Sequence, residues 1–413
     1  MVKFLLNEIT ADSETKNRSI MNQNISYHKK VKLSIKNLII GNIISLLWCM
    51  ACFSQPIDLK GQLSGWLVID DSVFTETKFG IRYVPGLSLK KSITNKHAFD
   101  LELSLNTYRS GQVHVMKNIK LTGKTKPYRL WLRYSMPQFE VRLGLQKINF
   151  GSATLLRSLM WFDRIDPRDP LQITDGVYGL LFRYYFLNNV NIWLWGLYGN
   201  DELKGWEMFP SHKDLPEYGG RIQLPFYDGE VAFSYHHRQM DLSNFPAAPY
   251  LPVNKTVPEN RFALDGKWDF GIGLWFESVL IYQQSELLFL DYQKLLNFGL
   301  DYTFSVGNGL HVLGEQLFIE KSDKIFCNGE QANFSAILAD YPLGLIDQVM
   351  SIFYYDWENQ NLYRFLSWQR IYDNWIFYLF GFWNPEQNQL YQNQTGSNPF
   401  AGKGFQVMVV FNH

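Results

Sequence analysis

The chain is poor in cysteine and has no net charge. Of its 413 residues three are Cys, and the 39 Lys and Arg balance the 39 Asp and Glu. Without a basic excess there is no reason to expect nucleic-acid binding. Cys49 and Cys52 lie near the N-terminus, so the long remainder holds only Cys327. One thiol makes neither an internal disulfide nor a thiolate metal cluster, which excludes disulfide-rich and zinc-ribbon proteins.

Catalytic and metal-binding motifs are missing as well. No HExxH, P-loop, GxSxG or zinc-spaced Cys/His set occurs. His236 and His237 are adjacent and would point to opposite faces of a strand, so they cannot share a metal ion. Ser234 and His236 would share a face, a pair that a Ser–His hydrolase needs but that also arises by chance. We therefore expect no enzyme activity, no metal site and no cofactor.

Long apolar runs are confined to the N-terminal segment. Four lysines between residues 29 and 36 precede the apolar run Leu38–Phe53, which ends in small residues. This order is typical of a secretory signal peptide. We expect residues 1–54 to be an N-terminal extension and cleaved signal peptide, with Met21 as the initiator and cleavage after Ser54. The alternatives are a membrane anchor, for which the run is short and polar, and a lipoprotein acceptor at Cys52.

Aromatic residues are abundant, at 16 % of the chain. A β-barrel in lipid uses such residues in girdles at both membrane interfaces. Beyond residue 55 no run approaches the ~20 apolar residues of a membrane helix, so a membrane-spanning chain would have to cross as strands. The alternative is an aromatic-rich secreted β-protein.

Period-two alternation indicates strands along most of the chain. In residues 98–106 apolar side chains alternate with polar ones, among them Asp100 and Glu102. The same pattern occurs in residues 128–135, 139–146, 182–186, 262–268, 296–304 and 405–411. The segments run about 9–12 residues, the length of a tilted membrane strand. Strands of ordinary globular proteins are shorter, about five or six residues.

Tight turns alternate with longer polar connections. The turns lie at residues 136–138, 187–189, 227–229, 269–271, 306–309 and 372–374, and their Gly, Asn and Asp residues suit short hairpins. The longer connections lie near residues 109–126, 150–176, 201–216, 241–259, 321–331 and 385–402. The pattern predicts an all-β fold, a transmembrane antiparallel β-barrel of about 18 strands (16–18) with short periplasmic turns and long outer loops. Residues 55–413 would form this single domain.

The third outer loop, residues 150–176, is the longest and is the candidate pore constriction. It combines apolar residues with two prolines and six charged residues: Arg157, Asp163, Arg164, Asp166, Arg168 and Asp169. A loop that folds into the barrel would pack its apolar residues on the wall and present its charges to the pore. The alternative is an ordinary outer loop with a short surface helix.

A second group of charged residues is predicted to line the lumen wall, because alternate residues of a strand point to opposite faces. These residues alternate with the lipid-facing set and are Arg129, Arg133, Arg142, Arg183, Arg221, Arg238, Asp100 and Glu102. Arginines opposite acidic loop groups would set up a transverse field that orients dipolar solutes, and would favour anions if the arginines dominate. The alternative, given equal weight, is that these arginines only form structural ion pairs with Asp and Glu.

Together these features resemble the bacterial outer-membrane porins. The resemblance rests on the signal peptide, the hairpin series from Gln55 to His413 and the long third loop. It implies an outer-membrane location, contact with lipid and lipopolysaccharide, passive diffusion of small hydrophilic solutes, a homotrimer, and a third loop that constricts the pore. The Ser54-Gln55 junction is similar to those of exported Bacteroidota proteins. Many porins end on an aromatic residue, whereas here Phe411 is the nearest candidate for that assembly signal.

Two other functions stay open on the sequence. One is a non-conducting outer-membrane barrel that serves as a partner-binding, export or assembly scaffold. Its binding surface would be the aromatic loops around Trp206, Phe209 and Phe245 and the segment 384–400. The other is a sugar channel whose lumen aromatics form a sliding track, with Trp66, Trp131, Tyr185, Trp193 and Trp195 as candidates.

Overall fold

The computed structural model describes residues 58–70, 76–114, 117–243, 256–284, 291–327, 329–385, 400 and 402–413. The chain divides into two units, residues 1–56 and 57–413, and the second is described here. The predicted signal peptide, its cleavage point after Ser54, and Phe245 lie outside the described residues.

Eighteen strands make up the described fold. The first nine are β1 (Asp58–Asp70), β2 (Glu76–Thr94), β3 (His97–His114), β4 (Lys117–Ser135), β5 (Phe139–Gln146), β6 (Val177–Tyr185), β7 (Asn191–Leu197), β8 (Glu217–Phe226) and β9 (Gly229–Asp241). The second nine are β10 (Thr256–Asp269), β11 (Gly273–Gln283), β12 (Tyr292–Phe304), β13 (Leu310–Ser322), β14 (Glu330–Pro342), β15 (Asp347–Asp356), β16 (Asn361–Tyr372), β17 (Trp375–Trp383) and β18 (Lys403–Asn412).

Each strand pairs antiparallel with the next, and β1 pairs with β18, so the sheet closes into a barrel. The seam between β1 and β18 runs from Gln62 opposite Asn412 to Asp70 opposite Gly404. It is extended by two backbone hydrogen bonds of 2.9 Å between Gly61 and His413. The prediction of an antiparallel barrel of about 18 strands is confirmed. Closure of the sheet leaves no strand edge unpaired.

The two ends of the barrel differ in their connections. At one end the strands are joined by eight turns of two to five residues, six of them at the positions predicted for tight turns. Asn189 and Gly271 adopt positive φ values of 65° and 81° there, which short hairpins require. At the other end the longest connection is residues 147–176, followed by residues 198–216 and 384–402. The prediction of a long loop near residues 109–126 was wrong, because β3 and β4 extend through most of that segment.

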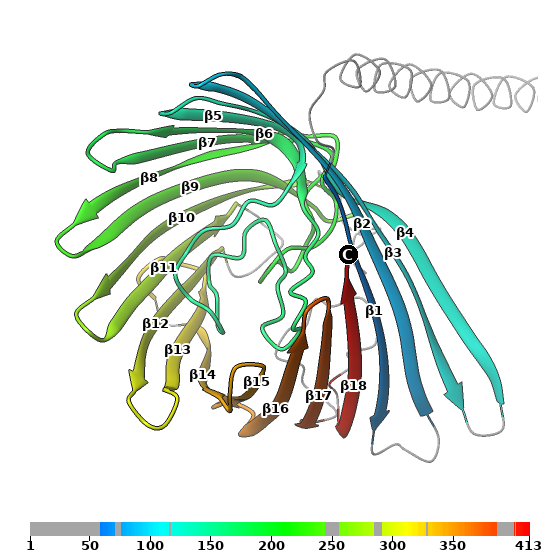
Figure 1. The fold of residues 1–413 in the computed structure, drawn as a ribbon. Helices are drawn as coiled ribbons and strands as arrows, with labels where there is room; N and C mark the ends of the chain where they lie inside the picture. The colour runs from blue at the N-terminus through cyan, green and yellow to red at the C-terminus, as the bar shows by residue number, and fades with distance from the viewer. Residues whose placement is uncertain are drawn as a thin grey trace, which may run out of the picture. The chain divides into compact units, whose positions relative to one another are not determined.

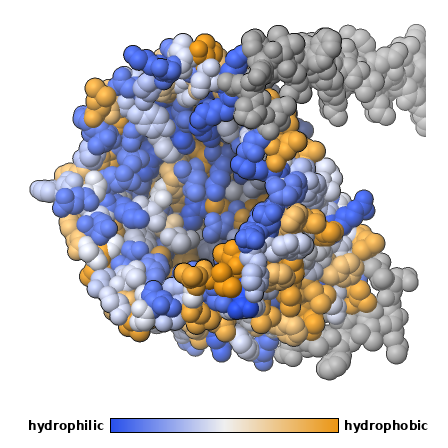
Figure 2. All heavy atoms as spheres, in the orientation of Figure 1, coloured by the Kyte–Doolittle hydropathy of each residue, from blue (hydrophilic) through white to orange (hydrophobic). Residues whose placement is uncertain are grey.

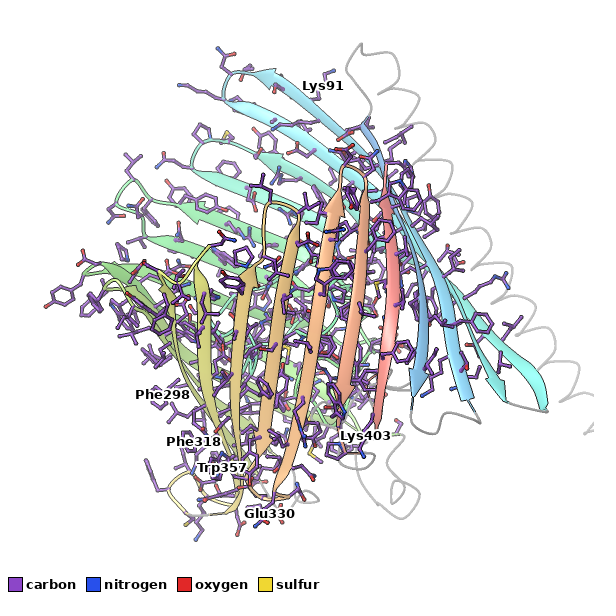
Figure 3. All side chains as sticks on the ribbon, turned by 60° about the horizontal axis from the view of Figure 1, so that its bottom comes forward. Lys91, Phe298, Phe318, Glu330, Trp357 and Lys403 are labelled. Atoms are coloured by element: carbon purple, nitrogen blue, oxygen red, sulfur yellow. The ribbon has the colours of Figure 1, made fainter. Side chains whose placement is uncertain are left out.

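The outer face of the barrel is apolar. Phe298 and Phe318 on β12 and β13 point outward and are 49 % and 43 % exposed (Figure 3). Exposed aromatic residues lie beside the short turns, such as Tyr227 and Trp375, and also near the loop end, such as Trp357. This distribution suits a sheet with hydrocarbon around its middle and aromatic girdles at both interfaces. No helix in the described ranges is long and apolar enough to cross a membrane.

The inner faces of β11 to β18 are also largely apolar. On β17, Tyr378, Phe380 and Phe382 point inward and are buried, and they belong to one cluster with inward residues of the neighbouring strands. Figure 2 shows hydrophilic residues gathered around the hollowed centre of the face and hydrophobic residues toward its margin. An apolar inner wall needs a cover, which the segment between β5 and β6 supplies.

Candidate functional site

Residues 147–176, called loop 3 below, run inside the ring of strands (Figure 1). Six apolar side chains of loop 3 are at most 3 % exposed and join the inner-wall cluster: Leu155, Leu156, Leu159, Met160, Trp161 and Phe162. The loop is therefore held by burial of apolar surface on the wall it faces, which is the main driving force for such packing.

Two wall carboxylates hold loop 3 by its backbone. Glu315 on β13 accepts hydrogen bonds from the backbone N–H groups of Thr154, Leu155 and Leu156, at 2.6, 3.1 and 2.6 Å. Glu277 on β11 accepts bonds from the N–H of Ala153 at 2.9 Å, and from the N–H and Oγ of Ser158 at 3.0 and 2.6 Å. These carboxylates compensate donors that would otherwise be buried without an acceptor.

Asn297 on β12 completes this arrangement, because its Nδ2 donates to the carbonyl oxygen of Leu156 at 2.7 Å. Glu277, Asn297 and Glu315, called the latch below, are at most 4 % exposed. They lie on three consecutive strands, so the middle of loop 3 is fixed at one place on the wall.

Residues 198–216, called loop 4 below, pack over loop 3. The indole N–H of Trp206 donates to the carbonyl oxygen of Arg157 at 2.7 Å, and the N–H of Gly205 donates to that of Asp163 at 3.0 Å. Glu207 forms ion pairs with Arg238 at 3.2 Å and with Arg261 at 2.7 Å. Loop 4 is thus attached to loop 3 on one side and to the β9–β10 wall on the other.

Two of the predicted constriction residues form an internal pair. Arg157 binds Asp163 at 3.2 Å, and also binds Asn149. Both members of the pair are buried, Asp163 to 2 % exposure. Burial raises the pKa of Asp163, and the nearby Arg157 opposes this rise. This pair stabilises the fold of the loop.

The other four constriction residues border open space. Arg164, Asp166 and Asp169 line a cavity of about 1220 Å³, called the main cavity below. Arg168 is buried, pairs with Asp166 at 2.8 Å and lies over the ring of Phe400. Burial also raises the pKa of Asp169 above the ordinary aspartate value.

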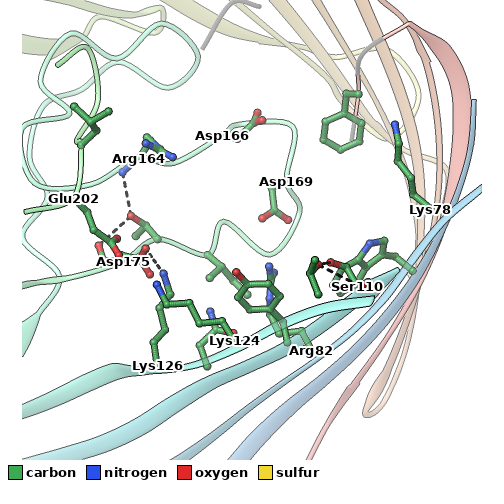
Figure 4. A pocket seen from close by; sticks show the side chains of 18 of the residues that line it. Lys78, Arg82, Ser110, Lys124, Lys126, Arg164, Asp166, Asp169, Asp175 and Glu202 are labelled. Carbon is green, nitrogen blue, oxygen red and sulfur yellow. Dashed lines mark hydrogen bonds and ion pairs between the residues drawn. The ribbon is translucent and has the colours of Figure 1, made fainter. Parts of the chain in front are cut away.

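The main cavity is basic on its barrel side and mostly acidic on its loop side (Figure 4). Its barrel side carries Lys78 and Arg82 on β2 and Lys124 and Lys126 on β4. Its loop side carries two basic residues, Arg164 and Lys204, and five acidic ones from loops 3 and 4, namely Asp166, Asp169, Asp175, Asp201 and Glu202. Lys126 and Asp175 form an ion pair across it. The remaining charges face each other across the space, which gives a transverse field.

A second cavity of about 480 Å³ lies between loop 3 and strands β14 to β17. Its lining includes Lys147, Arg157, Gln348 and Tyr378. Asp169 and Pro170 line both cavities, so this point of loop 3 lies between the two spaces.

Five of the predicted lumen-wall residues lie near each other on β3 to β6. Glu140 on β5 pairs with Arg133 at 3.3 Å, Arg142 at 3.6 Å and Arg183 at 3.1 Å, and Arg133 also pairs with Asp100 at 2.9 Å. Glu102 lies two residues from Asp100 and so faces the same side of β3. We call Glu140 and its three arginines the arginine cluster. It lines neither cavity, and with Asp100 and Glu102 on the same side its three arginines face three carboxylates, so it has no excess of cations.

The other three predicted wall arginines are buried structural groups. Arg129 donates to the carbonyl oxygen of Thr174 at 3.2 Å and so fixes the return of loop 3. Arg221 binds Asp265 at 2.6 Å, and Arg238 binds Glu259 at 2.5 Å. These three arginines therefore fit the alternative reading, in which wall arginines form structural contacts and do not face open space.

The sequence-based aromatic track is divided in the structure. Trp66 lines the main cavity. Arginine side chains lie over Trp131 and Trp193, with Arg142 4.7 Å and Arg183 3.8 Å from the ring centroids. Trp195 is buried and donates to His236 at 3.1 Å. His236 is fully buried and pairs with Glu217 at 3.3 Å. No cluster of three His, Cys, Asp or Glu suited to a metal ion occurs within the described ranges.

Comparison with known proteins found no family model and no curated protein that matches the chain. Among solved structures it is similar to OccD3 (OpdP) of Pseudomonas aeruginosa, with a TM-score of 0.53 and 8 % identity over 87 % of this chain and 91 % of that one. OccAB4 of Acinetobacter baumannii has a TM-score of 0.50 and 8 % identity over 87 % and 98 % of the two chains. The chain has an outer-membrane porin fold. At these identities the similarity establishes the fold alone.

The porin-like barrel contains functional groups that the sequence did not single out. They are the latch residues and the basic groups of the main cavity, Lys78, Arg82, Lys124 and Lys126. A signal for the latch was present on β11, since Glu277 is the one acid of a strand whose other residues are mostly apolar. Lys124 and Lys126 were hidden by the prediction of a loop at residues 109–126.

Proposed function

We propose that the protein is a bacterial outer-membrane channel through which small hydrophilic solutes diffuse passively. The observation that carries this proposal is the main cavity, which has a basic barrel side and a mostly acidic loop side and is bordered, like the second cavity, by Asp169 and Pro170. A solute would enter between loop 3 and strands β1 to β4, pass this narrow point and leave beside β14 to β17. Charged groups lining such a path decide which solutes pass.

The charge arrangement supports transport of dipolar solutes. The lining of the main cavity holds six basic and six acidic residues, so separation of charge is its main electrostatic feature. The arginine cluster would add a binding place for anions near the turn end, because its three guanidinium groups offer several N–H donors, although Asp100, Glu102 and Glu140 balance their charge. We therefore propose weak anion preference together with alignment of dipolar solutes across the cavity.

The apolar outer face supports insertion in the outer membrane, in contact with lipid and lipopolysaccharide. Export would use residues 1–54 as extension and cleaved signal peptide. A homotrimer is the assembly that we propose. Chemical cross-linking of the protein in isolated outer membranes tests it. Cross-linked samples that show the monomer but no band at three times its mass would reject the trimer.

A scaffold role is the second candidate. Loop 3 and the inward faces of β11 to β18 fill much of the interior with packed apolar side chains, and loop 4 covers loop 3. A non-conducting barrel that binds a partner through its outer loops would have this filling. The two candidates differ in whether the cavities connect.

Single-channel recording separates the candidates. The protein is purified from outer membranes of an expressing host and added to a planar bilayer under a salt gradient. Stable open steps with a defined reversal potential would support the channel, and the sign of that potential reports the preferred ion. A folded, heat-modifiable barrel that never conducts would reject the channel in favour of the scaffold.

A further inference from the structure

Two buried amide oxygens on the wall of the main cavity have no hydrogen-bond donor among the described residues. They are Oδ1 of Asn106 on β3 and Oε1 of Gln406 on β18, and their side chains are 2 % and 3 % exposed. Nε of Arg82 is likewise buried without an acceptor in the described part of the chain. Buried polar atoms of native proteins normally have partners, so these three atoms call for a ligand that both donates and accepts.

The strand register places these atoms along one line. Gln406 is a diagonal neighbour of Trp66, because Trp66 is opposite Met408 on β18. Trp66 is in turn diagonal to Arg82 across Gly80. Arg82 is directly opposite Tyr108, and Asn106 is the next inward residue on the strand of Tyr108. We call Gln406, Trp66, Arg82, Tyr108 and Asn106 the ladder.

The ladder alternates hydrogen-bonding atoms with ring faces. The Arg82 guanidinium carbon lies 5.5 Å from the centroid of the Trp66 ring and 5.7 Å from that of Tyr108. Trp66 lies against Gly80, where a Cβ atom would collide with the ring, so the glycine allows the indole to lie along the wall. From neighbour spacings in sheets the ladder spans roughly 25 Å. It is an extended track rather than a pocket for one small ion.

From this geometry we infer that the ladder is a binding track for neutral, polyhydroxylated solutes of oligosaccharide size. The inference rests on the proposed channel function and names its substrate class. Each sugar hydroxyl both donates and accepts, so one solute can donate to the two amide oxygens and accept from Arg82. The C–H faces of the sugar rings would pack on Trp66 and Tyr108.

Other ligand chemistries fit the ladder less well. A carboxylate or phosphate would bind Arg82 but would bring only acceptors to Gln406 and Asn106, and Asp169 faces it from loop 3 (Figure 4). An ammonium group would satisfy the amide oxygens but would be repelled by Arg82 and Lys124. A neutral sugar avoids both conflicts, and the balanced charge of the lining imposes no charge on it. The 1220 Å³ volume is ample for such a ligand.

Block of ion current by linear gluco-oligosaccharides of two to six units tests the inference, with the full protein purified from outer membranes. We expect interruptions of the current whose duration increases with sugar length, and no such effect from citrate. Gln406→Ala should raise the half-blocking concentration roughly three- to tenfold, the effect of one lost hydrogen bond. Gln112→Ala is the matched control, because Gln112 lines the same cavity off the ladder, and it should leave the block unchanged.

Three outcomes would overturn the inference. They are an absence of length-dependent block in a conducting channel, block by citrate rather than sugar, and equal effects of the Gln406 and Gln112 substitutions. Saturation-transfer NMR of the detergent-solubilised protein with maltotetraose separates this inference from the channel proposal. Sugar binding that is lost in Gln406→Ala, in a barrel that never conducts, would support the ladder and reject the channel.

Discussion

Removal of Glu315 should loosen loop 3 inside the barrel. In Glu315→Leu the backbone N–H groups of Thr154, Leu155 and Leu156 lose their acceptor. A buried donor left unsatisfied costs roughly 1–3 kcal/mol, so three of them cost about 3–9 kcal/mol at most. The cost falls on the closed position of the loop, because the barrel wall is held by its own strand pairing.

A milder substitution gives a graded comparison. In Glu315→Gln the amide oxygen can take the position of Oε2, which serves Leu155 and Leu156, and only the bond from Thr154 is lost. One bond to a charged group contributes about 1.5–3 kcal/mol, which corresponds to a roughly 10- to 150-fold larger fraction of displaced loop. The Leu variant should exceed the Gln variant in this fraction.

Current noise in single-channel records and the rate of proteolytic cleavage within loop 3 both report displacement. Glu320→Gln is the matched control, since Glu320 lies on the same strand and pairs with Lys294 on the other face. We expect noise and cleavage rate to rise in the order control, Gln, Leu. If both Glu315 variants behave like the control, the latch does not hold the loop and the reasoning fails.

Three further predictions concern ion selectivity. Glu140→Gln should shift the reversal potential toward anions, because it removes the carboxylate shared by three arginines; a shift toward cations would contradict this reading. Replacement of Arg129, Arg133 and Arg142 together by Ala should lower anion preference, and an unchanged reversal potential would refute a role of these cations in selectivity. Burial raises the pKa of Asp169 above 3.8, so this carboxylate takes up a proton at a higher pH than ordinary aspartate as the pH falls. Anion preference should then increase on acidification, as followed by pH-dependent reversal potentials, and Asp169→Asn should abolish that component.

The fold was predictable because its determinants are local. Alternation reports which face of a strand meets lipid, and Asn189 and Gly271 mark hairpins by their tolerance of positive φ. The extensions of β3 and β4 were missed because their residues are polar on both faces, as Tyr108 and Arg109 illustrate. A strand with water on both sides carries no alternating apolar signal and reads as a loop.

The site was harder to predict because its contacts join distant parts of the chain. Glu315 holds residues about 160 positions away, a pairing that no local pattern encodes. On β11 and β15 apolar residues occupy both faces for the same reason, since Trp275 and Ile352 point inward onto the apolar loop 3 cluster instead of water. Parity assigned charged residues to the inner wall, but whether an arginine there meets open space, as Arg82 does, or a loop carbonyl, as Arg129 does, depends on the course of loop 3.

The seam between β1 and β18 sets the order of assembly. The two strands that pair there, with Gly61 bonded to His413, are the first and last of the barrel to leave the ribosome. Until β18 exists, β1 has an open edge whose amide and carbonyl groups hydrocarbon cannot solvate. Insertion of single strands into hydrocarbon is therefore unfavourable, and the seam can form only once the chain through β18 is present. Loss of β18 alone would leave open edges on both β1 and β17, so the last ten-residue strand governs the survival of the whole barrel.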